Sequence, residues 1–301
     1  MSLIPRPAKL RHVIAARTRS SQITGIDIRN VLGAYDLGEL EGYSQPATGS
    51  GRSQSLIIRT NRGKKVLKRY KYSLNLEAIN YEHSVLGQLE TAGFCAPRLI
   101  LNRDGETCTE LEGSYYAVTD FIPGFKYVDF VISRRKKSEF IAEAARALAR
   151  YHRLINGFVP AGKKTDGFMP DGHRRWQESD WYLSEFDKYE SLLKDREPNG
   201  TPLEHFFLCN IERFKQDLVD LSRKFEENGH FLPQLVIHSD YGPYNILFDF
   251  DNGRVAAVLD FECTHLDWRA SELIGAIYRF SGKRNSIDYD HARTFLTAYR
   301  S

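Results

Sequence analysis

The sequence lacks any apolar run long enough to span a bilayer, and its first residues lack the charged-then-apolar order of a secretory signal. It is also poor in cysteine. The cysteines are Cys95, Cys108, Cys209 and Cys263. They are far apart and form no C-x-x-C pair, which excludes the usual spacing of a structural zinc site. We therefore expect free thiols, a reducing cytoplasmic location and no membrane partner.

Neither sign of charge dominates, because 42 lysines and arginines against 39 aspartates and glutamates leave a net charge of only +3 over 301 residues. Such a small surplus predicts no nucleic-acid partner. The surplus is uneven, however, since residues 1–24 contain no acidic residue. The basic residues of this segment are Arg6, Lys9, Arg11, Arg17 and Arg19. A solvated terminus is the simpler interpretation, and a phosphate-binding arm or an organelle-targeting stretch is the alternative.

Two halves of different character follow this basic segment. In residues 25–121, alternating apolar positions and turn residues predict short strands and one amphipathic helix. The predicted elements are strands at 54–60, 64–70, 97–102 and 115–121 and a helix at about 75–93. This pattern indicates a small, antiparallel-sheet lobe that carries one helix.

Residues 122–301 are typical of long helices instead. Apolar residues recur every three or four positions through 138–156 and 203–227, and a last helix is expected at about 288–301, where the sequence ends. The change of character at Ile122-Pro123-Gly124 is the predicted lobe boundary. The sequence thus predicts an α+β, two-lobe fold with a cleft, where small-molecule sites usually lie.

The candidate catalytic and metal-binding residues are concentrated in residues 235–262, LVIHSDYGPYNILFDFDNGRVAAVLDFE. This segment holds His238, Asp240 and Asn245 as H-x-D-x-x-x-x-N, followed by Asp260 in the pair D-F. Each residue alone is a common turn former, so the prediction depends on the ordered set. In phosphoryl transfer a base accepts the proton of the acceptor hydroxyl, and we assign that role to Asp240. His238 is expected to brace the loop by hydrogen bonding.

An apolar hairpin separates the two parts of this set. Asn252-Gly253 predicts a two-residue turn at its tip. In that register Asn245 lies directly opposite Asp260. An amide oxygen and a carboxylate then meet at one place, which predicts a Mg²⁺ site.

The small lobe offers an independent test. Alternation along strand 64–70 puts Val66 and Lys68 on one face and Leu67 on the other. On the next helix, Glu82 interrupts the apolar stripe, and a buried carboxylate requires a partner. We expect Lys68 to pair with Glu82 and to contact the nucleotide phosphates, while Val66 covers the base. The alternative is an exposed Glu82 at the edge of the stripe.

Two further segments are candidates for nucleotide contacts. Ser50 and Gly51 lie in a glycine-rich stretch before the first long strand, where successive N–H groups can bind an anion. Asp120 and Ile122 end the last strand of the small lobe, where adenine can bond the backbone.

From about Ile28 onward the chain resembles the aminoglycoside phosphotransferase, choline kinase and type II homoserine kinase superfamily, which is related to the protein kinases. HSDYGPYNILFD is similar to its catalytic loop, LDFE to its metal motif, YDLGELEG-to-VLKRY to its opening hairpins and ALARYH to its first large-lobe helix. The resemblance implies a protein-kinase-like fold, ATP and Mg²⁺ as cofactors, and the site roles proposed above.

Some positions depart from the kinase pattern. Ser239 replaces the arginine that follows the loop histidine in protein kinases, Glu262 replaces the glycine after D-F, and no A-P-E segment follows. Ser53 and Gln54 stand where many relatives have an asparagine. We therefore expect a small-molecule hydroxyl acceptor such as an aminoglycoside, choline or ethanolamine, or a homoserine-like compound. A kinase-like nucleotide-binding or scaffold protein without turnover is the alternative. Acceptor identity, ATP or GTP preference and oligomeric state stay open.

Overall fold

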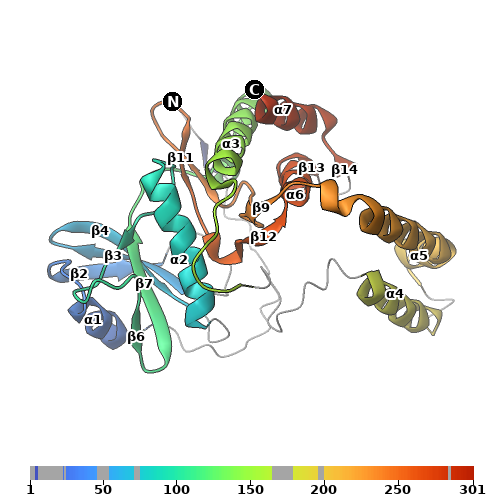
Figure 1. Ribbon diagram of the computed structural model, residues 1–301. Helices are drawn as coiled ribbons and strands as arrows, with labels where there is room; N and C mark the ends of the chain where they lie inside the picture. The colour runs from blue at the N-terminus through green and yellow to red at the C-terminus, as the bar shows by residue number, and fades with distance from the viewer. Residues whose placement is uncertain are drawn as a thin grey trace.

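The computed structural model describes residues 4–5, 23, 25–45, 54–70, 75–164, 179–195, 200–283 and 286–301. An antiparallel sheet comes first along the chain, and a helical region follows it (Figure 1), which confirms the predicted fold class. The exact boundary between lobes, placed between residues 121 and 122, stays a prediction. None of the described helices combines the length and the apolar character needed to cross a membrane.

The first sheet is six-stranded, in the order β2-β3-β4-β7-β5, and β6 also pairs with β7. Its strands are β2 (Leu40–Ser44), β3 (Gln54–Thr60), β4 (Gly63–Arg69), β5 (Leu99–Ile100), β6 (Thr109–Leu111) and β7 (Ser114–Asp120). The tight turn between β3 and β4 is the predicted one, with Thr60 paired to Gly63.

Alternation along β4 gives the sheet two different faces. Leu67 is fully buried in a cluster with Ile28 and Val31 of α1 (Gly25–Gly33). Lys68 points to the opposite face, where α2 (Leu76–Thr91) lies. The expectation of one helix beside this sheet is incomplete, because α1 is a second one. A nine-residue helix contains too few apolar positions to show a clear 3.6-residue period.

Helix α2 follows from local signals in the sequence. The side chain of Asn75 caps its first turn by accepting the N–H of Ala78 at 2.9 Å. Gly93 ends it with a left-handed φ of 63°. Glu82 is buried among the apolar residues of this helix, with an exposed fraction of 4%. The small-lobe helix therefore carries one carboxylate inward.

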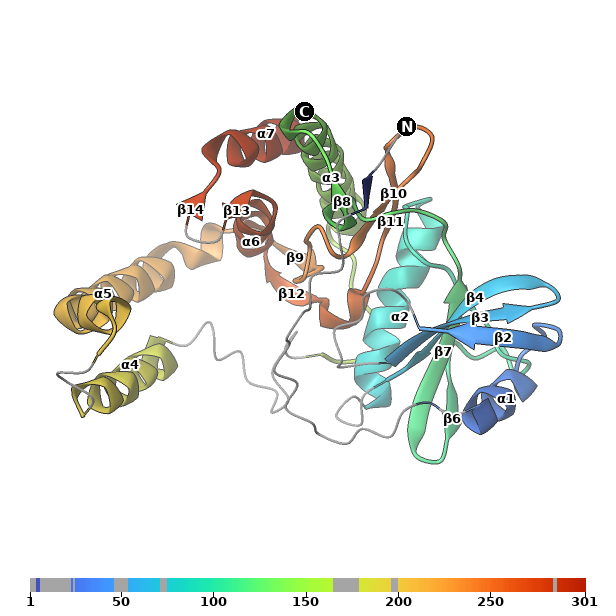
Figure 2. The ribbon, with the colours of Figure 1, turned by 180° about the vertical axis from the view of Figure 1, so that it is seen from behind.

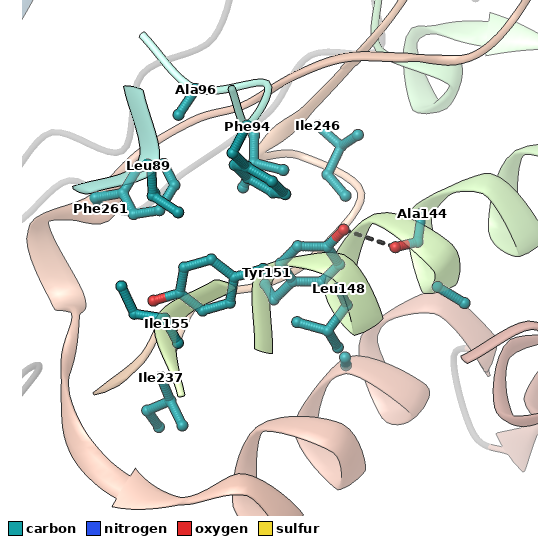
Figure 3. Packing of buried hydrophobic residues seen from close by; sticks show 14 of the residues in the cluster. Leu89, Phe94, Ala96, Ala144, Leu148, Tyr151, Ile155, Ile237, Ile246 and Phe261 are labelled. Carbon is teal, nitrogen blue, oxygen red and sulfur yellow. Dashed lines mark hydrogen bonds between the residues drawn. The ribbon is translucent and has the colours of Figure 1, made fainter. Parts of the chain in front are cut away.

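The main core lies between α2 and the helical region. It joins α3 (Arg134–Ile155), the antiparallel pair β10–β11, strand β9 of the pair β9–β12, and the helices α6 (Arg269–Ser281) and α7 (Tyr289–Arg300). Figure 3 shows Tyr151 and Leu148 of α3 within this core, and Phe261 beside Leu89 of α2. The pairs are β10 (Ile246–Phe248) with β11 (Val255–Val258), and β9 (Gln234–Ile237) with β12 (His265–Trp268).

Short elements complete the chain. They are β1 (Ile4–Pro5), paired with β8 (Phe130–Val131), β13 (Gly282–Lys283), paired with β14 (Ser286–Ile287), and the 3-10 turns η1 (Tyr127–Asp129), η3 (Gly229–Phe231) and η4 (Phe261–Cys263). Past β7, Phe125 exchanges backbone hydrogen bonds of 2.8 and 2.9 Å with Phe248 of β10. The hairpin β10–β11 is thereby tied to the segment that leaves the first sheet.

Helices α4 (Ser179–Lys194) and α5 (Pro202–Asn228) pack on each other and extend away from the body of the molecule (Figure 2). A capping box between Thr201 and Glu204 starts α5. The sequence predicted a strongly amphipathic helix here, but only Ile211 of α5 is buried. The apolar stripe of α5 is covered only in part, for example where Phe207 contacts Phe186 of α4.

Candidate active site

The hairpin that carries the catalytic segment has a different register from the predicted one. Ile246 pairs with Val258, and the N–H of Leu259 donates to the main-chain oxygen of Asn245 at 2.8 Å. Asn245 therefore lies opposite Leu259, so the predicted pairing of Asn245 with Asp260 is wrong by one residue. The cause is a wider turn than Asn252-Gly253 predicts.

Asp249 builds this wider turn. Its carboxylate accepts the N–H groups of Asp251 and Asn252 at 2.8 and 3.0 Å, and its own N–H bonds the oxygen of Arg254. The strand pairing also shifts between Leu247 and Phe248. The hydrogen bonds of Asp249 therefore set the conformation of this turn in place of the two-residue turn that Asn252-Gly253 predicts. Short polar side chains often bind nearby backbone groups in loops in this way.

Asp260 lies just beyond this hairpin in a left-handed conformation, with φ and ψ both 64°. Such a backbone costs about 1–3 kcal/mol and is concentrated at functional sites. The sharp turn sends Phe261 into the core and leaves Asp260 exposed. Burial, together with the charges of Asp260 and Asp240, raises the pKa of the Cys263 thiol to about 12. Both carboxylates therefore lie near Cys263.

Asp240 is held by two neighbours. The amide nitrogen of Asn245 donates to Oδ2 and to the main-chain oxygen of Asp240, each at 2.9 Å. The guanidinium of Arg279 on α6 lies 3.5 Å from Oδ1. The Asp240 side chain keeps 35% of its surface exposed. Because the nitrogen of Asn245 is used on Asp240, its amide oxygen is available for a cation.

His238 is completely buried and bonds on both ring nitrogens. Nε2 lies 2.8 Å from the oxygen of Leu259, and Nδ1 accepts the N–H of Asp240 at 3.3 Å. These partners favour a neutral ring that carries its proton on Nε2. The ring links the catalytic loop to the chain just before Asp260, and the bracing role stays a prediction.

Glu272 is a functional candidate that was not predicted from the sequence. This buried residue of α6 accepts the N–H of His238 at 3.0 Å and that of Ser239 at 2.7 Å, and it pairs with His152 at 2.9 Å. Burial favours its neutral form, but the hydrogen bond and charge of His152 contribute to an overall lowering of the pKa of Glu272. Glu272 fixes the loop at Ser239, where φ is 69°. No local pattern marks it, because its partners lie over thirty residues away.

Lys68 stands between two carboxylates. Its Nζ lies 2.8 Å from Oε1 of Glu82 and 3.5 Å from Oε2 of Glu262. Burial alone would lower the pKa of Lys68, but the Glu82 carboxylate, with additional contributions from Glu262 and Asp260, raises it well above its usual value. Lys68 is therefore a fixed cation. In the sequence, Glu262 stood out only as a departure from D-F-G.

The other predicted nucleotide contacts are less tightly defined. Val66 shares the face of Lys68 and pairs with Thr119 on the neighbouring strand. Asp120 uses its N–H and its carboxylate on the backbone of Arg98, at 3.1 and 2.7 Å. A backbone N–H of this segment that donates to adenine would therefore come after Asp120. Ile122, in that stretch, is half-buried. Ser50 and Gly51 lie outside the described residues.

Asn245 and Asp260 fit the requirements of Mg²⁺. Among the described residues no three His, Cys, Asp or Glu side chains form a metal-holding group. Mg²⁺ in kinases does not need such a group, because it is held by one or two protein oxygens together with phosphate oxygens and water. The exposed carboxylate of Asp260 and the available amide oxygen of Asn245 are oxygen donors of that kind.

Known proteins are similar to this chain in sequence. The model of a family described as "Phosphotransferase enzyme family" matches residues 44–301. A homoserine kinase of Caulobacter vibrioides is 27% identical over 241 residues, covering 80% of this chain and 66% of that protein. A homoserine kinase of Rhodopseudomonas palustris is 26% identical, covering 93% of this chain and 76% of that protein. The chain thus spans just under two thirds of the length of the Caulobacter relative.

Solved structures agree on the fold. An aminoglycoside phosphotransferase from Alicyclobacillus acidocaldarius superposes with a TM-score of 0.63 and 16% identity, covering 95% of this chain and 79% of that one. An amicoumacin kinase in complex with AMP-PNP and Ca²⁺ gives a TM-score of 0.61 and 12% identity, with coverage of 91% and 76%. At these identities the likeness concerns the fold alone.

Proposed function

Because the chain belongs to the phosphotransferase enzyme family, we propose that it transfers the γ-phosphate of ATP to a hydroxyl group of a small molecule in a Mg²⁺-dependent reaction. The observation that carries this proposal is the bonded pair of Asn245 and Asp240, with Asp260 directly after Leu259, whose N–H donates to Asn245. It combines a half-exposed carboxylate base with two oxygen donors for a metal.

Each residue has a separate task in this reaction. Asp240 accepts the proton of the acceptor hydroxyl as the oxygen attacks phosphorus. Lys68, held by Glu82 and Glu262, binds the α- and β-phosphates. Asn245 and Asp260 would hold Mg²⁺, which would neutralise charge on the phosphates. His238 and Glu272 keep the loop in place through hydrogen bonds to its backbone.

The surroundings of Asp240 favour an acceptor with a carboxylate. Arg279 reaches to 3.5 Å from the base, and its side chain is 36% exposed. An arginine beside the reacting hydroxyl suits an amino-acid-like acceptor, because guanidinium binds carboxylates strongly. The curated relatives are named homoserine kinases, which agrees with this chemistry. We therefore propose a homoserine-like acceptor.

A polycationic acceptor would require a surplus of free acids instead. The acids of helix α4 are largely engaged by lysines. Lys215 of α5 lies 2.7 Å from Asp187 and 2.8 Å from Glu190, and Lys188 lies 3.4 Å from Glu185. The acids of α4 therefore offer little free negative charge to a polycationic acceptor.

The test is ATP consumption by the purified protein with homoserine, choline, ethanolamine and aminoglycosides at several Mg²⁺ concentrations. We expect turnover with the hydroxy amino acid and loss of its binding in Arg279→Gln. Turnover with an aminoglycoside would overturn the acceptor class. Nucleotide binding without turnover on any acceptor would support the alternative, a kinase-like binding protein without catalysis.

A further inference from the structure

Residues 158–164 follow α3 and form a segment that we call the strap. It runs from the end of α3 to the side of α2 (Figure 1). The N–H of Ala161 donates to the hydroxyl of Ser84 on α2 at 2.9 Å. Three residues later, Nζ of Lys164 donates to the main-chain oxygen of Glu262 in η4. The strap therefore contacts both elements that supply carboxylates to Lys68.

Gly162 brings the strap against the first turns of α2. A Cβ atom at this position would stand 2.2 Å from the main-chain oxygen of Glu77 and 3.0 Å from the nitrogen of Tyr81. Its φ of +82° is also unfavourable for any other residue. Both the close approach and the conformation thus require glycine. Gly157, at the other end of this connection, has a φ of +76° but open space around its Cβ position.

Lys164, the last residue of the strap, lies near Lys68, Glu82 and Glu262, the charged side chains of the proposed nucleotide site. Burial lowers the pKa of Lys164, against the opposing effect of the Glu82 carboxylate, so the two side chains lie within electrostatic reach. The adjacent Lys163 is exposed. Of these neighbouring lysines, only Lys164 bonds to η4 in the described structure.

We propose that the strap is a positioning element of the nucleotide site, in which Lys164 is the positioning residue. By joining α2 to η4, it keeps Glu82 and Glu262 together on Lys68 and so fixes the lysine that meets the phosphates. Movement of α2 away from η4 would remove one carboxylate from Lys68. The expected effect on nucleotide binding rests on the proposed phosphotransfer function. The expected effect on the position of α2 rests on the contacts of the strap alone.

Two measurements on the full chain test this inference. The first is amide hydrogen exchange of α2 without nucleotide, and the second is titration with a fluorescent ATP analogue and Mg²⁺. The variants are Gly162→Ala and Lys164→Gln. Their controls are Gly157→Ala, with the same backbone strain but no contact, and Lys163→Gln, with the same loss of charge.

We expect both variants to speed exchange in α2 and to weaken binding of the analogue on the order of tenfold, or about 1.4 kcal/mol. Neither control should do so, and Lys164→Arg should restore binding. If Gly162→Ala does not fold, Ser84→Ala replaces it, because it removes only the 2.9 Å bond to Ala161.

The inference fails if the amide hydrogens of α2 exchange at the wild-type rate in both variants. This holds even if Lys164→Gln weakens binding of the analogue, because Lys164 would then act only as a direct ligand of the nucleotide. The exchange measurement involves no nucleotide. Absence of Mg²⁺-dependent binding in the wild-type protein would therefore overturn the proposed function, while the exchange rates would still decide whether the strap holds α2 in place.

Discussion

Asn245 and Asp240 are bonded through their side chains, with the amide nitrogen 2.9 Å from Oδ2 of the carboxylate. The same nitrogen lies 2.9 Å from the main-chain oxygen of Asp240. This double contact fixes the orientation of Asp240 before any substrate arrives. It also directs the amide oxygen of Asn245 away from the base. The proposed base and one proposed metal ligand are thus positioned as a unit.

Replacement of the base should separate chemistry from binding. We expect Asp240→Asn to lower the turnover rate by about 10²–10⁴-fold, because the amide cannot accept the hydroxyl proton. Affinity for ATP should change little, since Lys68 and its carboxylates stay in place. Single-turnover kinetics and a binding titration on the same preparation measure the two effects. Near-wild-type turnover would remove Asp240 from the mechanism.

The two proposed metal ligands should differ in how much each contributes to Mg²⁺-dependent nucleotide binding. We expect Asp260→Ala to weaken Mg²⁺-dependent binding of a fluorescent ATP analogue more than Asn245→Ala does, because an ionised carboxylate binds a divalent cation more strongly than a neutral amide. The control is Asp251→Ala, an exposed aspartate in the hairpin turn. Unchanged magnesium dependence in Asp260→Ala would exclude this residue from the metal site.

Lys68 and Glu82, 2.8 Å apart, should behave as one unit. Lys68→Ala and Glu82→Ala should each lose most activity, and the double variant should be little worse than either. Losses that multiply in the double variant would show that the two residues act independently. Glu90→Ala serves as control, because Glu90 is exposed on the same helix. Full activity in Glu82→Ala would contradict the proposed role of this pair.

Glu272 should affect the rate through the catalytic loop. In Glu272→Gln an amide NH₂ replaces one of the two oxygens that accept the N–H groups of His238 and Ser239, so one of these donors loses its acceptor. We expect a lower kcat with little change in ATP affinity, and a loss of stability of about 1–3 kcal/mol from the buried N–H that is left without an acceptor. Glu139→Gln, on the exposed surface of α3, should change neither. A wild-type kcat in Glu272→Gln would refute the positioning role.

His83 should make the fold sensitive to acid. Burial, with a smaller effect from Lys68, lowers the pKa of His83 from 6.5 to about 3. Between these values the unfolded chain binds a proton that the folded chain does not. The stability is therefore complete above pH 6.5 and falls as the pH drops toward 3, by about 1.4 kcal/mol per pH unit.

The variant that tests this dependence is His83→Gln, which can still bond Tyr70 and Thr107. Urea unfolding at pH 7 and pH 5 should show an extra loss of about 2 kcal/mol in the wild-type protein relative to the variant. Equal pH dependence in both proteins would mean that His83 is not buried in its neutral form.

The sequence by itself determined the features that depend on local periodicity. The period-two pattern of β4 and the 3.6-residue pattern of α2 each pointed a charged side chain inward, and in the structure Lys68 and Glu82 are in contact. The order of His238, Asp240 and Asn245 likewise marked the loop that we propose to be catalytic. Such signals are readable because backbone geometry alone decides which residues share a face.

Only the tertiary structure decided how distant segments meet. The hairpin register depended on whether Asp249 or Asn252-Gly253 builds the turn, and sequence patterns do not rank these two turn signals. The support of the loop by Glu272 and the second carboxylate on Lys68, Glu262, arise from the packing of α6 and η4. Contacts of this kind depend on the mutual placement of whole elements, which no local pattern encodes.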